Sequence, residues 1–429
     1  MAETTQGKQF ISVARVFFLL IVIPLLLMSF LIANGIFQLG DVSKKGTISV
    51  LDEKSQQEIL VRASTVAENV AGFLQESERN VLIATILPAT EEAYKEFYDN
   101  NVKTLWVKQD GKIVKVLEPL YAEMALIDEA GNEVIKIVDG EAVPKSQLKN
   151  VSNPANTTYK SEDYFVRTTK MNKGEVYVSP VTGWYVNKDD FKKGERFDGI
   201  IRFTTPLFDK QGFTGVISLA LDVRHLAQFT DTIIPTEAGH VLEADASTGN
   251  YAYMVDNKGF VISHPSDFHI AGLKSDGTPV PPITGGAAEK GEVLNLNLLG
   301  DMDPALPQVA SDAAAGNSGI KSYKFGGRSK VVAYAPIPFY SKQFPAPAGF
   351  GWVGMGIDVD RFNEQAKTAS DKIEKEAHAW MTTIILILIL AMVLLFVIAA
   401  ILAKGINRSI SSEVPPEALE AARYYDDED

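Results

Sequence analysis

The sequence of 429 residues contains no cysteine and only five histidines. Without thiols the chain cannot form disulfide bonds, thiolate zinc sites or iron–sulfur clusters, and it has no cysteine nucleophile. No histidine shares an element with carboxylates at metal-ligand spacing, so we expect neither a metal site nor a cofactor. The formal net charge of -13 disfavours nucleic acid as a partner.

Enzyme signatures are also missing from the sequence. There is no G-x-S-x-G motif, no Walker loop and no G-x-G-x-x-G sequence opening a helix after a strand. Gly354-x-Gly356 lies inside a predicted strand, where two glycines favour close packing over phosphate binding. The carboxylates are plentiful but scattered, so they form no recognisable acid–base pair. We therefore expect a protein that is not an enzyme.

Two long apolar runs stand near the ends of the chain, at residues 16–38 and 381–403. Neither contains a charged side chain, and each is long enough to cross a hydrocarbon core of ~30 Å as a helix. Basic residues precede the first run and follow the second, so the positive-inside rule places both termini in the cytoplasm. A cleaved signal peptide is the alternative for the first run, but this run is longer than a signal h-region and lacks a small-x-small cleavage site.

Helical periodicity follows the first apolar run. Apolar side chains recur at spacings of four and three residues, which predicts an amphipathic helix with a narrow seam. The residues of this seam are Ile59, Ala63, Val66, Val70 and Phe73. Two interpretations remain open: the seam packs on its own domain, or it pairs with a second copy of the chain. Pro88 is expected to end or kink the helix.

The period changes to two from about residue 103, which predicts strands. The expected strands cover residues 104–107, 113–117, 121–127, 133–137, 175–179, 199–204, 214–222, 251–255, 260–264, 329–335 and 352–358. Short helices are expected at residues 161–171, capped by Ser161, and at residues 223–232. Residues 271–320 are rich in Gly, Pro, Ala and Asp and predict a long loop, whereas residues 361–380 predict a charged helix.

An ordered set of segments resembles a bacterial double Cache sensor domain. The first half of that resemblance rests on residues 121–137 (YAEMALIDEAGNEVIKI), 163–165, 174–180 (GEVYVSP), 200–209 (IIRFTTPLFD) and 215–226 (GVISLALDVRHL). The second half rests on residues 253–265 (YMVDNKGFVISHP), 333–337 and 350–358. The resemblance implies an α+β fold with two PAS-like Cache modules. Each module has an antiparallel sheet, and both lie along a long N-terminal helix.

The resemblance also implies a domain layout between two transmembrane helices. We expect a cytoplasmic tail at 1–15, a first transmembrane helix at 16–38, a stalk or long helix at 39–100, a membrane-distal Cache module at 101–235, a membrane-proximal Cache module at 236–360, a connecting helix at 361–380, a second transmembrane helix at 381–403 and a short acidic cytoplasmic tail at 404–429. The chain would then lie in the inner membrane of a bacterium with its central domain in the periplasm.

The ligand pattern of the amino-acid-binding subclass transfers poorly to this sequence. The position of its carboxylate-clamping Arg holds Glu162, and the position of an Asp on the last strand holds Ala220. A glutamate repels a ligand carboxylate, so we expect no standard α-amino-acid sensor. If Glu162 faces the pocket, a cationic or polyhydroxy ligand is favoured; alternatively Glu162 is solvated and the pocket is empty or apolar.

Candidate ligand-binding residues follow from this alignment and from strand periodicity. They are Glu162, Tyr164, Phe165, Tyr177, Ser179, Trp184, Tyr185, Arg202 and Thr204. Trp184 and Tyr185 begin a long loop that we expect to cover the site. Core packing is the alternative for each of these residues.

The resemblance implies a receptor subunit that binds a small ligand and signals through its membrane helices. Residues 404–429 are too few for a catalytic domain, so we expect output through a partner protein, with the receptor acting as a homodimer. The alternative is a non-signalling membrane-anchored interaction protein, or a truncated fragment of a chemoreceptor or sensor kinase.

Overall fold

The computed structural model describes residues 2–109, 112–237, 244–284, 292–325, 328–358 and 364–413. Several features of the sequence, including parts of the segments predicted above, lie outside these residues. They are the Asp110-Gly111 turn, His240, the first three residues of the expected 361–380 helix, and residues 414–429 of the expected acidic tail.

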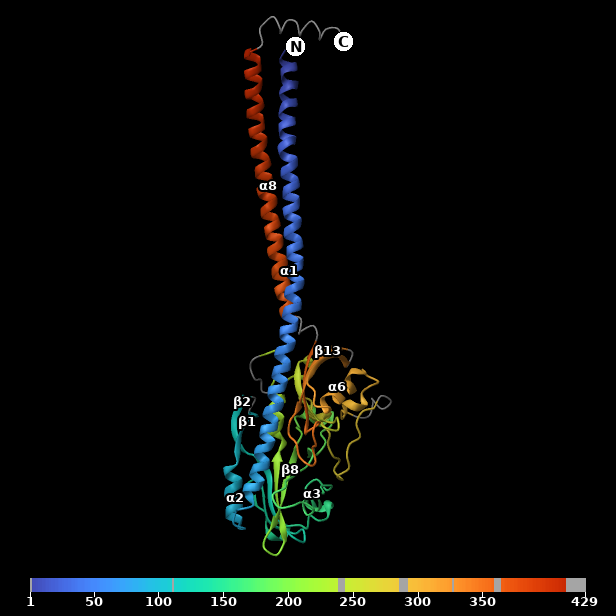
Figure 1. The fold of residues 1–429 in the computed structure, drawn as a ribbon. Helices are drawn as coiled ribbons and strands as arrows, with labels where there is room; N and C mark the ends of the chain where they lie inside the picture. Colours follow the sequence, from blue (N-terminus) through green and yellow to red (C-terminus); the bar gives the residue numbers. More distant parts are fainter. Residues whose placement is uncertain are drawn as a thin grey trace. The chain divides into compact units, whose positions relative to one another are not determined.

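Two long helices carry the apolar runs. α1 (Ala2–Ala84) and α8 (Glu364–Glu413) are drawn in blue and red in Figure 1. The chain divides into two compact units. The first part of α1 and α8 belong to one unit, and residues Glu53–Asn363 form the other. Within the described residues, only Asp371–Leu402 is long and apolar enough to cross a membrane, and 6% of its apolar window is buried. Leu19–Gly35 of α1 is a shorter apolar segment, so the first span stays a prediction.

The larger of the two main sheets is antiparallel and has seven strands. Its order is β5-β4-β3-β9-β8-β6, and β7 pairs with β8. The strands are β3 (Tyr121–Asp128), β4 (Glu133–Val138), β5 (Glu141–Ala142), β6 (Tyr177–Val178), β7 (Thr182–Gly183), β8 (Gly199–Phe208) and β9 (Phe213–Asp222). Long hairpin pairing between β8 and β9 forms its centre.

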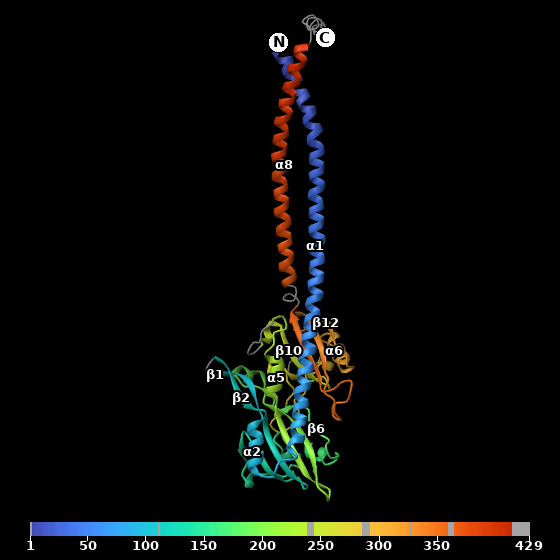
Figure 2. The same cartoon turned by 60° about the vertical axis from the view of Figure 1, so that its left-hand side comes forward.

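A five-stranded antiparallel sheet follows in the chain, with the order β11-β10-β14-β13-β12. Its strands are β10 (Tyr251–Asp256), β11 (Val261–Ser263), β12 (Gly319–Phe325), β13 (Arg328–Ile337) and β14 (Gly351–Asp358). A separate hairpin consists of β1 (Val102–Gln109) and β2 (Lys112–Pro119). Figures 1 and 2 show this hairpin beside the C-terminal part of α1, on the same side as α2.

Shorter helices connect the strands. The α-helices are α2 (Glu91–Asn100), α3 (Tyr164–Thr168), α4 (Lys188–Lys193), α5 (Val223–Asp231) and α6 (Ala305–Ala314). The 3-10 helices are η1 (Lys145–Gln147), η2 (Pro154–Asn156), η3 (Ala246–Thr248), η4 (Asp267–His269) and η5 (Leu296–Leu298). α5 begins directly after β9, where Asp222 caps it by accepting from the Arg224 backbone N–H.

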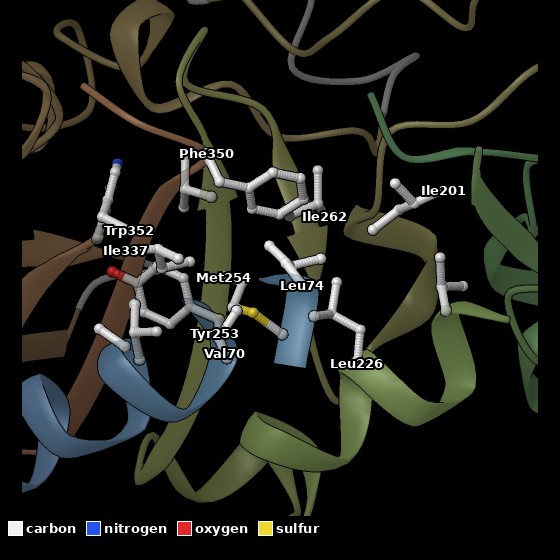
Figure 3. Packing of buried hydrophobic residues seen from close by; sticks show 14 of the residues in the cluster. Val70, Leu74, Ile201, Leu226, Tyr253, Met254, Ile262, Ile337, Phe350 and Trp352 are labelled. Atoms are coloured by element: carbon white, nitrogen blue, oxygen red, sulfur yellow. The ribbon is translucent and has the colours of Figure 1, made fainter. Parts of the chain in front are cut away.

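The amphipathic seam of α1 lies in the core of its own protomer. Its five residues are between 0% and 7% exposed. Both sheets turn one apolar face to this helix, and all these side chains form a single hydrophobic cluster. Figure 3 shows Val70 and Leu74 of α1 in the same packed region as Leu226 of α5 and Met254 of β10. The interpretation that the seam pairs with a second copy is therefore wrong, because the seam is already covered.

The long helix ends just before Pro88, as predicted, so it does not extend through the whole expected stalk at residues 39–100. α1 ends at Ala84, four residues before Pro88, and a separate α2 begins after the Thr90 cap. Residues 39–100 therefore do not form one helix. The side chain of Thr90 accepts a hydrogen bond from the backbone of Ala93, which starts the new helix.

Two other segments also differ from the sequence-based expectation. The helix expected at residues 161–171 is confined to α3, and Ser161 does not cap it, because its hydroxyl donates to the Tyr159 carbonyl. Residues 271–320, expected to be a loop, contain α6 and the start of β12. α6 buries Leu306 and Val309 among small alanines, a pattern that the Gly- and Pro-rich composition of the segment obscured.

The second face of the five-stranded sheet carries aromatic rings, and α6 packs over it. Tyr253 of β10 lies opposite Gly354 of β14, and its ring packs edge-on to Trp352. A Cβ atom built on Gly354 would lie 2.5 Å from Tyr253 Cζ, so the glycine is required for the ring to lie flat on the sheet. A cavity of only about 30 Å³ remains beside Tyr253. The prediction of close packing is therefore confirmed for Gly354, whereas Gly356 has only ordinary contacts, the nearest at 3.6 Å.

Thiol labelling distinguishes the two faces of α1 in a chain that has no native cysteine. Val70 is 0% exposed, whereas Thr65 is exposed. We expect Thr65→Cys to react rapidly with a maleimide in the folded protein and Val70→Cys to react only on unfolding. Rapid labelling at both positions would show that the seam is not covered in the protomer.

Gly354→Ala should destabilise the chain by about 1–3 kcal/mol, because the new methyl group overlaps the buried Tyr253 ring. Gly356→Ala is the matched control on the same strand, since its nearest neighbour, Tyr323 Oη, lies 3.6 Å from the built Cβ. We expect the control to be neutral or slightly stabilising. Equal denaturation midpoints for the two variants would contradict the packing described here.

Candidate ligand site on the seven-stranded sheet

A buried arginine lies at the centre of the face of the seven-stranded sheet that does not contact α1. Arg202 projects from β8, and its side chain is 2% exposed. Its Nη2 lies 2.9 Å from Glu123 Oε2 on β3, and its Nε donates to Glu162 Oε1. The strand register explains the first contact, because Arg202 and Glu123 both pair with Ala220 of β9 and therefore share one face.

The ionic network extends along the sheet to β4. Lys136 Nζ lies 3.7 Å from Glu123 Oε2 and 2.8 Å from Glu133 Oε1. The other oxygen of Glu133 accepts the Lys149 backbone N–H at 3.0 Å. Two cations and three carboxylates therefore meet here, and each carboxylate is also held by a neutral donor or by a second cation.

Glu162 reaches this network from outside the sheet. It lies in the turn between η2 and α3, and its side chain is 8% exposed. Both of its oxygens contact Arg202, with Oε2 lying 3.2 Å from Nη2, which is the two-point geometry of an arginine–carboxylate pair. Oε2 also accepts the Tyr159 backbone N–H at 3.1 Å. The alternative in which Glu162 is solvated is therefore wrong.

Aromatic and hydroxyl groups surround the ion pairs. The ring of Tyr164 lies over the guanidinium, with Arg202 Cζ 4.6 Å from the ring centroid. Phe165 and Tyr177 belong to an apolar cluster on this face. Thr204 shares the face with Arg202, as the period of two predicted, and bonds to the hydroxyl of Thr168.

The network controls the protonation of its members. Burial alone would raise the pKa of Glu123, but the positive charges of Arg202 and Lys136 outweigh burial and lower this pKa to about 2. Burial alone would lower the pKa of Arg202, and the carboxylates of Glu162 and Glu123 instead raise it well above its ordinary value. Arg202 and Glu123 are therefore charged at neutral pH.

The other candidate residues hold the site in place or lie at its edge. Ser179 Oγ accepts the Arg202 backbone N–H at 2.9 Å and so fixes the end of β6 against β8. Trp184 packs against Tyr159, with ring centroids 5.1 Å apart. Tyr185 instead donates to Glu292, in the part of the chain that carries the five-stranded sheet. Trp184 and Tyr185 therefore do not form a lid together.

Sequence reasoning missed four members of the site: Glu123, Glu133, Lys136 and Tyr159. A signal existed for Glu123, because it interrupts an apolar run on a predicted buried strand, as Arg202 does on another. Opposite charges inside two buried strands indicate a pair, since an unpaired buried charge is costly. No comparable signal identified Tyr159, which lies in a segment without periodicity.

The described histidines do not form a metal site. Within the described ranges, no group of three or more His, Asp and Glu side chains is placed to hold a metal ion. His264 and His269 do meet, with ring centroids 5.0 Å apart, although Pro265 separates them in the sequence. Burial lowers the pKa of both residues, and this keeps both rings neutral at neutral pH.

A larger hollow lies elsewhere in the same unit. Its volume is about 530 Å³, and it lies between β1, α5 and η4, with Trp106, Phe197 and Asp267 among its lining residues. None of the candidate ligand residues predicted from the sequence lines this hollow.

Removing the Arg202 guanidinium should destabilise the fold by about 3–5 kcal/mol, because Glu123 and Glu162 would stay buried without their partner. In the native protein, the lowered pKa of Glu123 contributes stability that is complete above its ordinary pKa of 4.5 and is lost as the pH falls toward about 2. In Arg202→Gln the unpaired carboxylates are favoured in their protonated form. The stability of this variant should therefore rise as the pH falls from about 7 to about 5.

The matched control for this substitution is Arg224→Gln, which removes an arginine whose side chain is 51% exposed and paired with Asp222. We expect this control to cost less than ~1 kcal/mol and to keep the native pH profile. Denaturant unfolding of the full chain in detergent measures both variants. Similar losses for the two would contradict a buried network centred on Arg202.

Comparisons with known proteins give the family of the chain. The family model dCache_1, described as a Cache domain, matches residues 43–365. No curated protein matches the chain. Similar solved structures include a domain of a sensory box/GGDEF family protein from Vibrio parahaemolyticus, with 13% identity and a TM-score of 0.45 over 73% of this chain and 100% of that one.

Two chemoreceptor domains are also similar. The sensory domain of the Campylobacter jejuni chemoreceptor Tlp3 has 11% identity and a TM-score of 0.41, covering 75% of this chain and 100% of its own. The ligand-binding domain of the Pseudomonas aeruginosa PAO1 chemoreceptor PctC, in complex with GABA, has 13% identity and a TM-score of 0.37, covering 68% and 95%. The family assignment rests on the family model, which covers most of the sequence, and the chain belongs to the dCache family of Cache-domain proteins.

Proposed function

We propose that this protein is a membrane-anchored sensor subunit whose Cache region binds a small molecule outside the cytoplasm. The two sheets would form the membrane-distal module (residues 101–235) and the membrane-proximal module (residues 236–360). The signal would pass through the terminal helices of a homodimer to a partner protein. Contact between two copies would use a surface other than the buried seam of α1.

The observation that carries the proposal is the apolar segment of α8. The Cache match ends at residue 365, and the apolar stretch Asp371–Leu402 follows almost at once. Its large side chains are exposed, with Leu386 at 65% and Leu390 at 73%. Such a surface needs a lipid environment rather than water. A sensor region joined directly to a membrane helix is suited to report external conditions across the membrane.

The Arg202 network supports the ligand-binding part of the proposal. Its charged groups lie on the sheet face opposite the one that packs on α1, and the segment that covers them contains only short helices. Buried charges tend to gather at functional sites, because a purely structural face gains more from apolar packing. This site therefore lies between a regular β-sheet and a segment with little regular structure.

Reporter fusions test the membrane topology. We expect alkaline phosphatase to be active when fused after residue 40 or before residue 380, because the basic flanks hold both termini in the cytoplasm. Fluorescent protein fused after residue 408 should fluoresce. Active phosphatase at residue 408 together with inactive phosphatase in the middle would refute a sensor outside the cytoplasm.

A further inference from the structure

The Glu162 carboxylate is held as a bound acid would be held. It occupies the edge of the Arg202 guanidinium formed by Nε and Nη2, and the Tyr159 backbone N–H gives it a further donor. Tyr164 covers one face of the guanidinium, and Glu123 takes the remaining position on Nη2. Arg202 therefore has a two-point carboxylate site, and the chain fills that site itself.

The charged side chains of the network come from two kinds of backbone structure, the strands of the sheet and an irregular turn. Arg202, Glu123 and Lys136 stand on three strands of one sheet and are fixed by its register. Glu162 stands in the turn between η2 and α3. Lys160 in the same turn adopts a positive φ of 58°, which costs energy in a residue with a side chain. The strand pairing of β8 fixes Arg202, whereas no strand pairing holds the backbone of Glu162.

The donors of Arg202 that Glu162 satisfies indicate which ligand can replace it. Without Glu162, the sheet contributes two cations, Arg202 and Lys136, and two carboxylates, Glu123 and Glu133. The Nε edge of Arg202 would then be buried without an acceptor. A carboxylate satisfies both nitrogens with paired charge-assisted bonds, whereas a cation would meet the unpaired guanidinium. The unsatisfied donors of the guanidinium therefore favour an acid, not the cationic ligand that the sequence suggested.

We propose that Glu162 is a built-in occupant of a carboxylate-binding site on Arg202, and that a small carboxylic acid anion binds there when the Glu162 turn moves away. This inference rests on the proposed sensor function and adds its ligand class and its regulation. In the resting protein the site is closed by the chain's own side chain. A ligand must compete with that side chain, so the strength of the internal pair sets the sensitivity of the site.

Movement of the Glu162 turn would also affect the segment at residues 273–275. Lys160 Nζ donates to the Ser275 carbonyl at 2.8 Å and lies 6.0 Å from the centre of the Trp184 ring. The Tyr185 backbone N–H donates to the Leu273 carbonyl at 2.9 Å, beside Trp184. The turn that carries Glu162 therefore contacts residues 273–275, which precede strands β12, β13 and β14 of the five-stranded sheet in the sequence. Displacing Glu162 would break or shift these contacts.

Acetate is the probe for this proposal, because Glu162→Ala removes a CH2–COO⁻ group of the same size. We expect sodium acetate to raise the melting temperature of the full-length Glu162→Ala protein in detergent, saturably and by at least ~2 °C. Wild type should respond only at much higher acetate concentrations, because acetate must first displace Glu162. Acetamide, which has the same shape but no charge, should have no effect at matched ionic strength.

The double variant Glu162→Ala with Arg202→Gln is the matched control, since it keeps the vacated space but lacks the guanidinium. An acetate response that persists in this variant, or that is equal in wild type, overturns the proposal. So does a folded Glu162→Ala protein without a response. If Glu162→Ala unfolds, recovery with acetate but not acetamide supports the proposal, and failure to recover overturns it. The measurement needs no membrane topology, so its outcome is independent of the fusion experiment.

Discussion

The burial of one guanidinium constrains much of this structure. A positive charge that is 2% exposed must be neutralised where it stands, because water does not reach it. One neutralising group comes from β3, which is separated from β8 by β9, so the pairing of these three strands must be correct. A slip of one residue would turn Glu123 toward the apolar face that packs on α1. The second group, Glu162, draws an irregular segment onto the sheet.

The two sheets differ in how the face that does not contact α1 is covered. Each has one face on α1, and each must cover the other face. The seven-stranded sheet covers it with ion pairs and a segment that has little regular structure. The five-stranded sheet covers it with α6 over a layer of tyrosine rings, of which Tyr253 lies flat on Gly354 and leaves only a small cavity. The first arrangement can exchange one partner for another, whereas the second is a close fit of apolar groups.

The sequence predicts the strands of this protein better than it predicts the site. Alternation located β3, β9 and β14 to within a residue or two, because each strand buries one or both faces in a regular way. It missed β12, an edge strand of which only Tyr323 is fully buried. Identifying α1 as amphipathic did not reveal what its seam contacts, since a covered seam and a dimer seam have the same period.

The error at Glu162 has a similar cause. Sequence reasoning named both Glu162 and Arg202 as candidates, but treated the glutamate as a charge facing a ligand. The two residues are 40 positions apart, and one lies in a turn without periodicity, so no local pattern predicts their contact. Glu123 was recoverable in principle as a charge inside a buried strand. What joins the three residues is the strand order of the sheet, which neither spacing nor composition contains.

The stacking of Trp184 on Tyr159 gives the molecule an optical property. The chain has four tryptophans, and Trp184 lies against the residue whose backbone N–H holds Glu162. The emission of an indole depends on its solvation and on nearby cations such as Lys160. Opening of the Glu162 turn would change both the solvation of Trp184 and its distance from Lys160. Light absorbed and emitted by the native chain therefore carries information about the occupancy of Arg202, without any added dye.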